Sequence, residues 1–242
     1  MSTLILMYHN IAHPPKRGRL KGLYVSPSMF RFQMWYLKAA GFVVVPLHEI
    51  MDFGGTDARR KKVVALTFDD GYEDFYVNAF PVLEKYGYPA TVFVVSDLVG
   101  TTNAWDENSL GIRKQLMAWD RIRALSSRNV FFGSHTRTHP FLTRIEEQRA
   151  REEIDSSKKI IEEQTRHVVE TFCYPYGDRN NAVKRMVREA GYKVAVTTDR
   201  GSVHREDDPL TLRRAFIRYN THPIHFLQKL HTGYEDRKGR RT

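Results

Sequence analysis

Short apolar segments rich in β-branched residues alternate with amphipathic segments along almost the whole chain, and this alternation limits the folds it can adopt. Strands are predicted at residues 3–8, 42–45, 63–68, 91–95, 130–133, 168–173, 193–197 and 212–217. Helices are predicted at residues 27–40, 72–86, 119–125, 146–164, 180–190 and 223–230. Seven or eight strand–helix units without a linker predict one parallel α/β domain, and 242 residues suit a closed or nearly closed barrel.

Reactive side chains follow several of these strands at their carboxyl ends. Asp69 and Asp70 follow the strand at 63–68, and His135 follows the strand at 130–133. Because active sites of parallel barrels are built at the carboxyl ends of the strands, we expect these side chains to meet. Taken alone, Asp69-Asp70-Gly71 is also compatible with a solvated turn.

A metal ion is the simplest way to keep two adjacent carboxylates ionised in a partly buried site, because like charges repel. His135 and His139 have a spacing at which two imidazoles can bind one ion. The same spacing occurs at His9 and His13 in a chain with ten histidines, so chance can also produce it. Joined to Asp70, however, His135 and His139 form a two-histidine, one-carboxylate set that leaves positions for water and substrate.

Three segments resemble the first three motifs of the polysaccharide deacetylases, the NodB-homology enzymes of carbohydrate esterase family 4. They are Thr67-Phe68-Asp69-Asp70-Gly71, Ser134–His139 and Phe172–Gly177, in the order and separation that the family shows. The likeness covers roughly residues 1–230. It implies a single-domain, distorted barrel of about seven strand–helix units, and metal-dependent hydrolysis of N-acetyl groups on sugars.

The resemblance also implies roles for individual residues. Asp70, His135 and His139 would bind one divalent ion, with zinc expected, and Asp69 would be the general base. Such an ion polarises the acetamide carbonyl and lowers the pKa of bound water, from which Asp69 takes the proton. The backbone N–H of Tyr176 would help to stabilise the oxyanion.

One departure from the family concerns an arginine. The third motif usually begins with an arginine that pairs with the catalytic aspartate, and Cys173 stands at that position here. Arg214, in the last predicted strand, is our candidate for the missing partner of Asp69. The alternative is that Arg214 is one surface arginine among many.

The other departure concerns the general acid, which many members take from a Leu-x-His segment near the C-terminus. His222 and His225 lie there, but neither closely follows an apolar strand. A corresponding segment, Leu6-Met7-Tyr8-His9-Asn10, lies at the N-terminus, as in the circularly permuted branch that includes poly-N-acetylglucosamine deacetylases. We therefore predict His9 as the acid; the alternative is a packed histidine bonded to a loop carbonyl.

The predicted function is a metal-dependent carbohydrate N-deacetylase with a catalytic domain at residues 1–235 and a basic tail at 236–242. Its expected partner is an N-acetylated glycan, and the net charge of +10 makes an anionic or lipid-linked glycan an option. Trp105 is a candidate to line the sugar cleft. A hydrolase of another C–N bond in a small molecule, or a glycan-binding relative without turnover, stays as an alternative.

Other classes of function find little support in the sequence. No motif predicts nucleic-acid binding, and no apolar run reaches transmembrane length. The single cysteine, Cys173, excludes an intrachain disulfide. The first residues do not resemble a signal peptide, which makes a cytoplasmic location the default expectation, with a trimmed precursor as the alternative.

Overall fold

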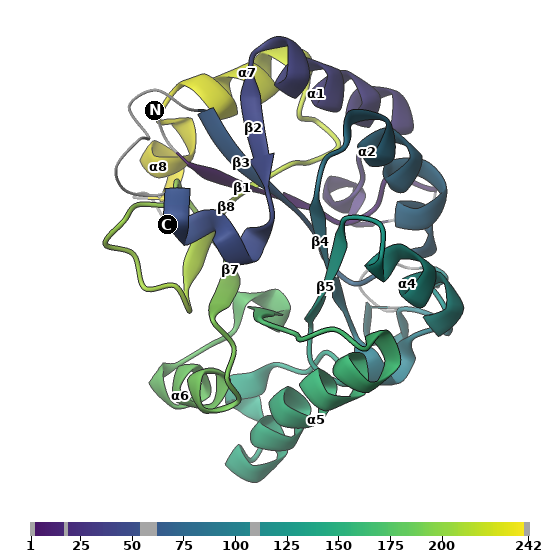
Figure 1. The fold of residues 1–242 in the computed structure, drawn as a ribbon, viewed down its shortest axis with the longest axis vertical. Coiled ribbons are helices and arrows are strands. Elements are labelled where there is room, and N and C mark those ends of the chain that lie inside the picture. The colour runs from purple at the N-terminus through teal and green to yellow at the C-terminus, as the bar shows by residue number, and fades with distance from the viewer. Residues whose placement is uncertain (1–2, 17–18, 54–61, 107–111, 240–242) are drawn as a thin grey trace.

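Eight parallel strands form the centre of the computed structural model, which describes residues 3–16, 19–53, 62–106 and 112–239 (Figure 1). The strands are β1 (Leu4–Tyr8), β2 (Phe42–Val45), β3 (Lys62–Phe68), β4 (Ala90–Val94), β5 (Val130–Ser134), β6 (Thr171–Cys173), β7 (Val194–Arg200) and β8 (Leu212–Phe216). Seven of them close into a ring in the order β1-β8-β7-β6-β5-β4-β3, with β3 paired back to β1. The predicted single-domain parallel barrel is therefore confirmed.

The ring is distorted where β2 joins it. All of β1 pairs with one edge of β3, while the other edge is shared between β2 and β4. β2 takes the first half of that edge, up to Ala65, and β4 pairs only with Thr67 and Phe68. Strand pairing in the ring is also sparse between β5 and β6, which share the single residue pair Ser134 and Phe172.

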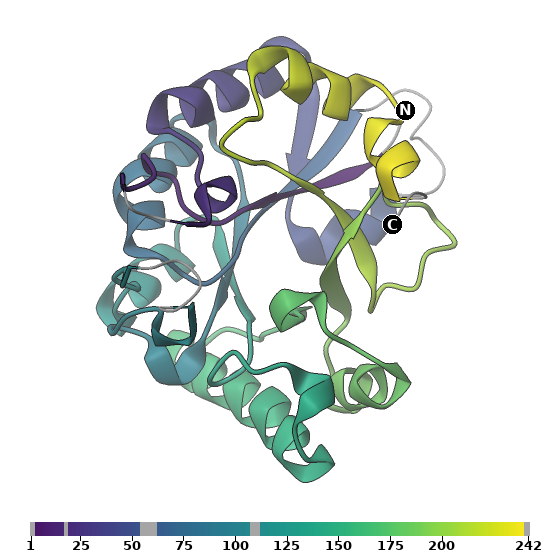
Figure 2. The ribbon, with the colours of Figure 1, turned by 180° about the vertical axis from the view of Figure 1, so that it is seen from behind.

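The helices surround the ring on its outside, as the views from its two ends show (Figures 1 and 2). Their bounds are α1 (Pro27–Ala39), α2 (Phe80–Tyr86), α4 (Trp119–Ser126), α5 (Glu147–Thr165), α6 (Asn181–Glu189), α7 (Pro223–His231) and α8 (Tyr234–Gly239). α1 begins as predicted, because the Ser26 side chain accepts the Met29 N–H directly before Pro27. The predicted helix at 72–86 contains a π turn at Phe75–Ala79, since Pro81 has no N–H to continue the ordinary α-helical pattern.

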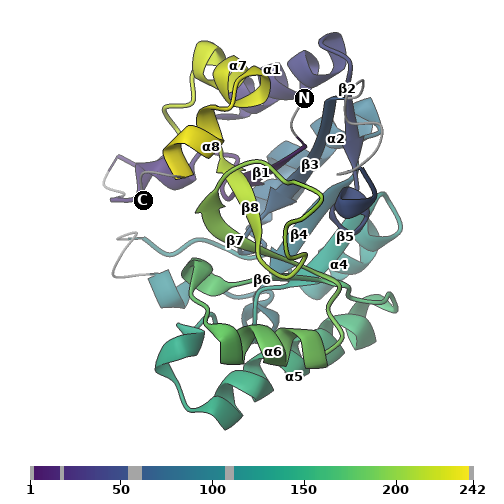
Figure 3. The same ribbon diagram turned by 90° about the vertical axis from the view of Figure 1, so that its left-hand side faces the viewer.

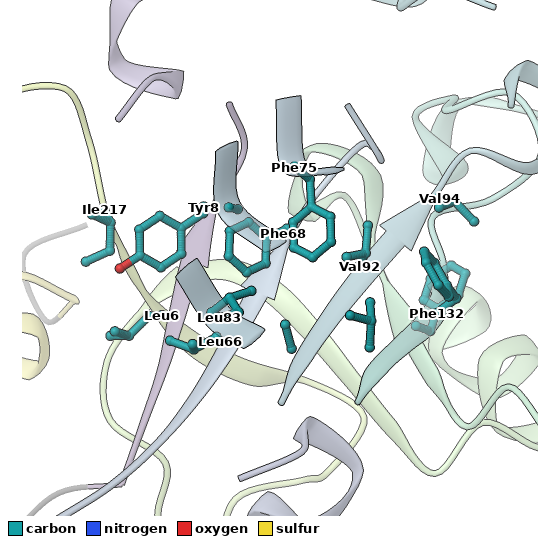
Figure 4. Close-up of a cluster of buried hydrophobic side chains, with 14 of the residues drawn as sticks. Leu6, Tyr8, Leu66, Phe68, Phe75, Leu83, Val92, Val94, Phe132 and Ile217 are labelled. Atoms are coloured by element: carbon teal, nitrogen blue, oxygen red, sulfur yellow. The ribbon is translucent and has the colours of Figure 1, made fainter. Parts of the chain in front are cut away.

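A cluster of aromatic and aliphatic side chains fills the space between the ring and its helices beneath the ends of β1 and β3 (Figure 4). The Tyr8 ring stacks on Phe68 at 5.2 Å between centroids, and Phe75 meets Phe68 edge-on at 4.7 Å. Each fully buried side chain of this size contributes about 1.5–3 kcal/mol to stability. This packing fixes the two strand residues that directly precede His9 and Asp69.

The C-terminal segment is a packed helix rather than a free tail as far as residue 239. α8 lies against β7 (Figure 3), and Asp236 accepts hydrogen bonds from the backbone N–H and the hydroxyl of Ser202. Glu235 is buried and forms ion pairs with Arg200 and Lys229. The predicted boundary after residue 235 thus falls inside α8, and residues 240–242 lie outside the described residues. Among the described helices, none combines the length and the apolar character that crossing a bilayer requires.

Candidate active site

One pocket of about 580 Å³ opens where several strands of the ring reach their carboxyl ends. Six of the seven predicted site residues line it, namely His9, Asp69, Asp70, His135, His139 and Tyr176. The seventh, Arg214, is buried behind Asp69. The structure therefore brings together residues that are up to about 200 positions apart in the sequence.

Three side chains form a compact set of ligand atoms. Asp70 Oδ1 lies 3.5 Å from His135 Nε2 and 3.6 Å from His139 Nε2, and the two Nε2 atoms are 3.2 Å apart. Ligand atoms at 2.0–2.1 Å from a tetrahedral zinc ion are roughly 3.3 Å from one another. All three side chains are buried, so this set of donors fits one small divalent ion.

His135 is oriented as a metal ligand would be. Its Nδ1 donates its hydrogen to the backbone carbonyl of Cys173 at 2.7 Å, so Nε2 faces Asp70. Burial lowers the pKa of His135, but Cys173 and Asp70 outweigh it and raise that pKa above its usual range, so a bound ion would take the place of the Nε2 proton. Burial favours the uncharged form of Asp70, but the hydrogen bond to His135 and the nearby histidines outweigh it and lower the pKa of Asp70. Burial, followed by the charge on His135, lowers the pKa of His139 to about 3. Asp70 is thus ionised and His139 neutral at pH 7.

Backbone strain is concentrated at this site. Six residues other than glycine have a positive φ in the described part of the chain, and four of them belong to the site or its turns: Asp70, Thr136, His139 and Tyr176. Each such residue costs on the order of 1–3 kcal/mol. Gly71 continues the turn after Asp70 with φ at 72°, and a Cβ atom there would lie 3.0 Å from Val94.

Glu153 on α5 holds the strained turn between the two histidines. Its buried carboxylate accepts hydrogen bonds from the backbone N–H groups of Arg137 and Thr138 at 2.9 Å each, and from the Thr138 hydroxyl at 2.6 Å. Thr136 Oγ1 accepts the His139 N–H at 3.0 Å. Glu153 was not among the predicted site residues, although an acidic residue on the inward face of a charged helix is a signal that could have identified it.

Arg214 pairs with Asp69 through both guanidinium Nη atoms, each 2.7 Å from one carboxylate oxygen. Its Nε donates to the Thr197 carbonyl at 2.8 Å, and Nη2 lies 3.3 Å from Cys173 Sγ. The arginine of β8 thus reaches the place next to Cys173, and the surface alternative is wrong because the side chain is fully buried. Burial alone would raise the pKa of Asp69, but Arg214 outweighs it and holds that pKa below its usual range.

His9 lies on the other side of Asp69, with Nε2 3.8 Å from Asp69 Oδ2. Its buried Nδ1 has no hydrogen-bond partner in the described residues, so the alternative of a loop-carbonyl bond finds no support. Burial lowers the pKa of His9, although the charges of Asp69 and Asp70 oppose the shift. His222 and His225 lie exposed at the start of α7, outside the pocket lining.

Aromatic rings surround His139, one of the three candidate ligands. Trp105 stacks on its imidazole at 4.8 Å with the planes 27° apart, and Tyr176 meets it edge-on at 4.6 Å. Tyr176 in turn stacks on Phe141 at 3.9 Å. These contacts restrict the ring of His139, whose own Nδ1 finds no partner in the described part of the protein. Trp105, the predicted cleft residue, therefore packs on a candidate ligand at the site.

Asp106 also lines the pocket but has no sequence signal that predicts it. It ends a short 3-10 turn, Ala104–Asp106, in the irregular insertion between β4 and α4. Burial, followed by the negative charge of Asp70, raises the pKa of Asp106 to about 6, while the Trp105 indole opposes the shift. The pocket thus holds a third carboxylate besides Asp69 and Asp70.

Comparison with known proteins identifies the family. The polysaccharide deacetylase family model matches residues 56–195, more than half of the chain. This chain belongs to the polysaccharide deacetylase family. The chain resembles YxkH of Bacillus subtilis (strain 168), whose name refers to the same family, with 28% identity over 214 residues, covering 88% of this chain and 70% of YxkH. It is 24% identical over 208 residues to the poly-β-1,6-N-acetyl-D-glucosamine N-deacetylase of Staphylococcus aureus (strain MSSA476), covering 82% of this chain and 69% of that protein.

Solved structures of two similar proteins have the same fold. The Streptococcus pyogenes deacetylase PplD, solved in complex with acetate, matches with a TM-score of 0.82 and 27% identity, covering 95% of this chain and 98% of PplD. IcaB from Ammonifex degensii matches with a TM-score of 0.77 and 25% identity, covering 94% of each chain. The barrel of this protein therefore agrees with those relatives over nearly its whole length.

Proposed function

We propose that this deacetylase uses one divalent metal ion to remove N-acetyl groups from an amino-sugar glycan or glycoconjugate. The observation that carries the proposal is the set of Asp70, His135 and His139, whose ligand atoms lie 3.2–3.6 Å apart beside the arginine-bound Asp69. The Staphylococcus aureus relative is named for N-deacetylation of poly-β-1,6-N-acetyl-D-glucosamine, which supports a glycan substrate. Zinc is the ion we expect, because two imidazoles and one carboxylate are common zinc ligands.

Asp70, His135 and His139 would hold this ion, which when bound would polarise a carbonyl and make water more acidic. Asp69 accepts the proton of the attacking water, because its low pKa keeps the carboxylate ionised at neutral pH. Arg214 bonds to both oxygens of Asp69 and so fixes the plane of the carboxylate, while each oxygen keeps a lone pair for the proton.

His9 donates a proton to the departing amine, which is a poor leaving group without one. Its Nε2 is close enough to Asp69 to receive the proton that Asp69 has taken from water, after a small side-chain movement from 3.8 Å. This route accounts for a histidine whose resting pKa is lowered, since His9 need not be charged before substrate binds. The backbone N–H of Tyr176 is the proposed donor to the oxyanion.

The test combines metal analysis with acetate release from a panel of N-acetylated oligosaccharides, neutral and anionic. We expect one metal ion per chain and acetate release that a chelator abolishes and added zinc restores. Asp69→Asn should keep the metal and lose roughly 100- to 10,000-fold in turnover, whereas Asp70→Asn should weaken metal binding itself.

Two results would overturn the proposal. Turnover of small amides or imides without any acetate release from glycans would favour the hydrolase alternative. Glycan binding without turnover in the metal-loaded protein would favour a non-catalytic relative. Equal metal loss in Asp69→Asn and Asp70→Asn would show that the roles of the two aspartates are misassigned.

A further inference from the structure

The position of Asp106 is fixed by an anchored loop rather than by a regular element. Its N–H donates to the Asn103 carbonyl at 3.1 Å, and Asn103 is fully buried. The Asn103 backbone N–H bonds to the Lys114 carbonyl at 3.1 Å, and its amide lies 3.4 Å from the Tyr72 hydroxyl. Trp105, next to Asp106, stacks on His139. These contacts hold Asp106 in the pocket wall near the metal ligands.

Asp106 is a buried carboxylate that the Trp105 indole and the charge of His135 compensate only in part. It is only 8% exposed, and within the described residues no lysine or arginine forms an ion pair with it. Its charge acts instead on groups of the same pocket, because burial and then Asp106 raise the pKa of Tyr176. Burying an acceptor beside the anionic Asp70 is unfavourable unless a donor satisfies it. Since Asp106 borders a pocket large enough for a sugar, that donor can come from the substrate.

We propose that Asp106 accepts a hydrogen bond from a ring hydroxyl of the sugar whose acetamide is hydrolysed, and so determines which sugars are accepted. The inference rests on the proposed glycan deacetylation and deepens it. A sugar placed against Asp70 with its acetamide presents hydroxyl groups on neighbouring ring carbons, within reach of the adjoining wall. A buried acceptor discriminates strongly against a substrate that lacks the matching donor, because the acceptor then stays unpaired.

The test uses N-acetylated oligosaccharides and a set of analogues that each lack one ring hydroxyl. With the wild-type protein, one of these analogues should lose roughly 10- to 100-fold in kcat/KM relative to the parent sugar. Asp106→Ala should lose a similar factor on the parent sugar, but no further factor on that one analogue. Asp106→Leu, which keeps a side chain of similar shape but has no acceptor, serves as a second variant. Asp120→Ala changes an exposed carboxylate on α4 and should match the wild type on every substrate.

Metal content distinguishes this role from ligation, because Asp106→Ala should bind as much zinc as the wild type. The inference is overturned if each missing hydroxyl lowers kcat/KM by the same factor in Asp106→Ala as in the wild type. It is also overturned if Asp106→Ala loses its zinc. If Asp106→Ala does not fold, the same comparison in Asp106→Leu decides. The proposed function fails separately, when the wild type releases no acetate from any of the parent oligosaccharides.

Discussion

Two segments of this protein have the same His-x-x-x-His spacing but very different structures. His135 and His139 place their Nε2 atoms 3.2 Å apart beside Asp70. His9 lies in the pocket against Asp69, whereas His13 is exposed. The spacing is therefore not what makes a pair of histidines into a candidate metal site.

The difference comes from what the intervening backbone bonds to. Between His135 and His139 the chain turns back on itself, with positive φ angles at Thr136 and His139 and with Glu153 accepting two of its N–H groups. After His9, by contrast, Ile11 is bound on both sides, its N–H to Asp74 at 2.9 Å and its carbonyl to Asn78 at 2.8 Å.

This comparison shows how the barrel uses its loops. The segment after β1 is hydrogen-bonded to Asp74 and Asn78, at the helical turn before α2. It therefore leads away from the pocket, and of its two histidines only His9 stays there. The turn after β5 is hydrogen-bonded to the buried carboxylate of Glu153 on α5. This turn brings the Nε2 atoms of His135 and His139 close together. Tertiary anchors, not local spacing, decide which histidines act together.

The largest effect should come from His139→Ala compared with His13→Ala. Removing one of three candidate ligands should abolish most metal binding and lower acetate release by more than about 1,000-fold, because the ion's charge stabilisation is lost. His13→Ala should stay within about twofold of the wild type, since that side chain is exposed. Metal stoichiometry and acetate release measure both. A His139→Ala variant that is active and fully loaded with metal would show that His139 is not required for metal binding.

His9→Ala should have the next largest effect, compared with His222→Ala. Loss of the proton donor should slow amide hydrolysis by roughly 100- to 1,000-fold, and an activated acetate ester, whose leaving group needs no proton, should be affected far less. His222→Ala should behave like the wild type on both substrates, because this side chain lies outside the pocket lining. Full amide activity in His9→Ala would rule out the assignment of the acid.

Glu153→Ala should have the smallest effect of the three and tests the anchor itself. Without this carboxylate, the N–H groups of Arg137 and Thr138 lose their acceptor, and the strained turn should relax. We expect metal affinity to fall roughly 10- to 100-fold, measured by competition with a chelator. Glu152→Ala is the matched control, because its side chain is the exposed neighbour on the same helix. Unchanged affinity in a folded Glu153→Ala would show that the turn holds its shape unaided.

The sequence by itself was enough to predict the parallel barrel and six of the residues that line its pocket. Strand periodicity, and motifs that stand at strand ends, are local patterns, and parallel strands must bring their carboxyl ends to one face. The positions of Asp69, Asp70, His135 and His139 follow from that rule. The seven-stranded ring came from the family resemblance, and the structure agrees with it.

Only the tertiary structure decided the contacts between elements that are distant in the chain. Arg214 could be a surface residue from its sequence context, and it becomes the partner of Asp69 because β8 lies next to β1 and β7 in the closed ring. Glu153 and Asp106 reach the site from a helix face and an irregular loop, neither of which has a motif. The lowered pKa of His9 likewise depends on burial, which no local pattern of residues measures.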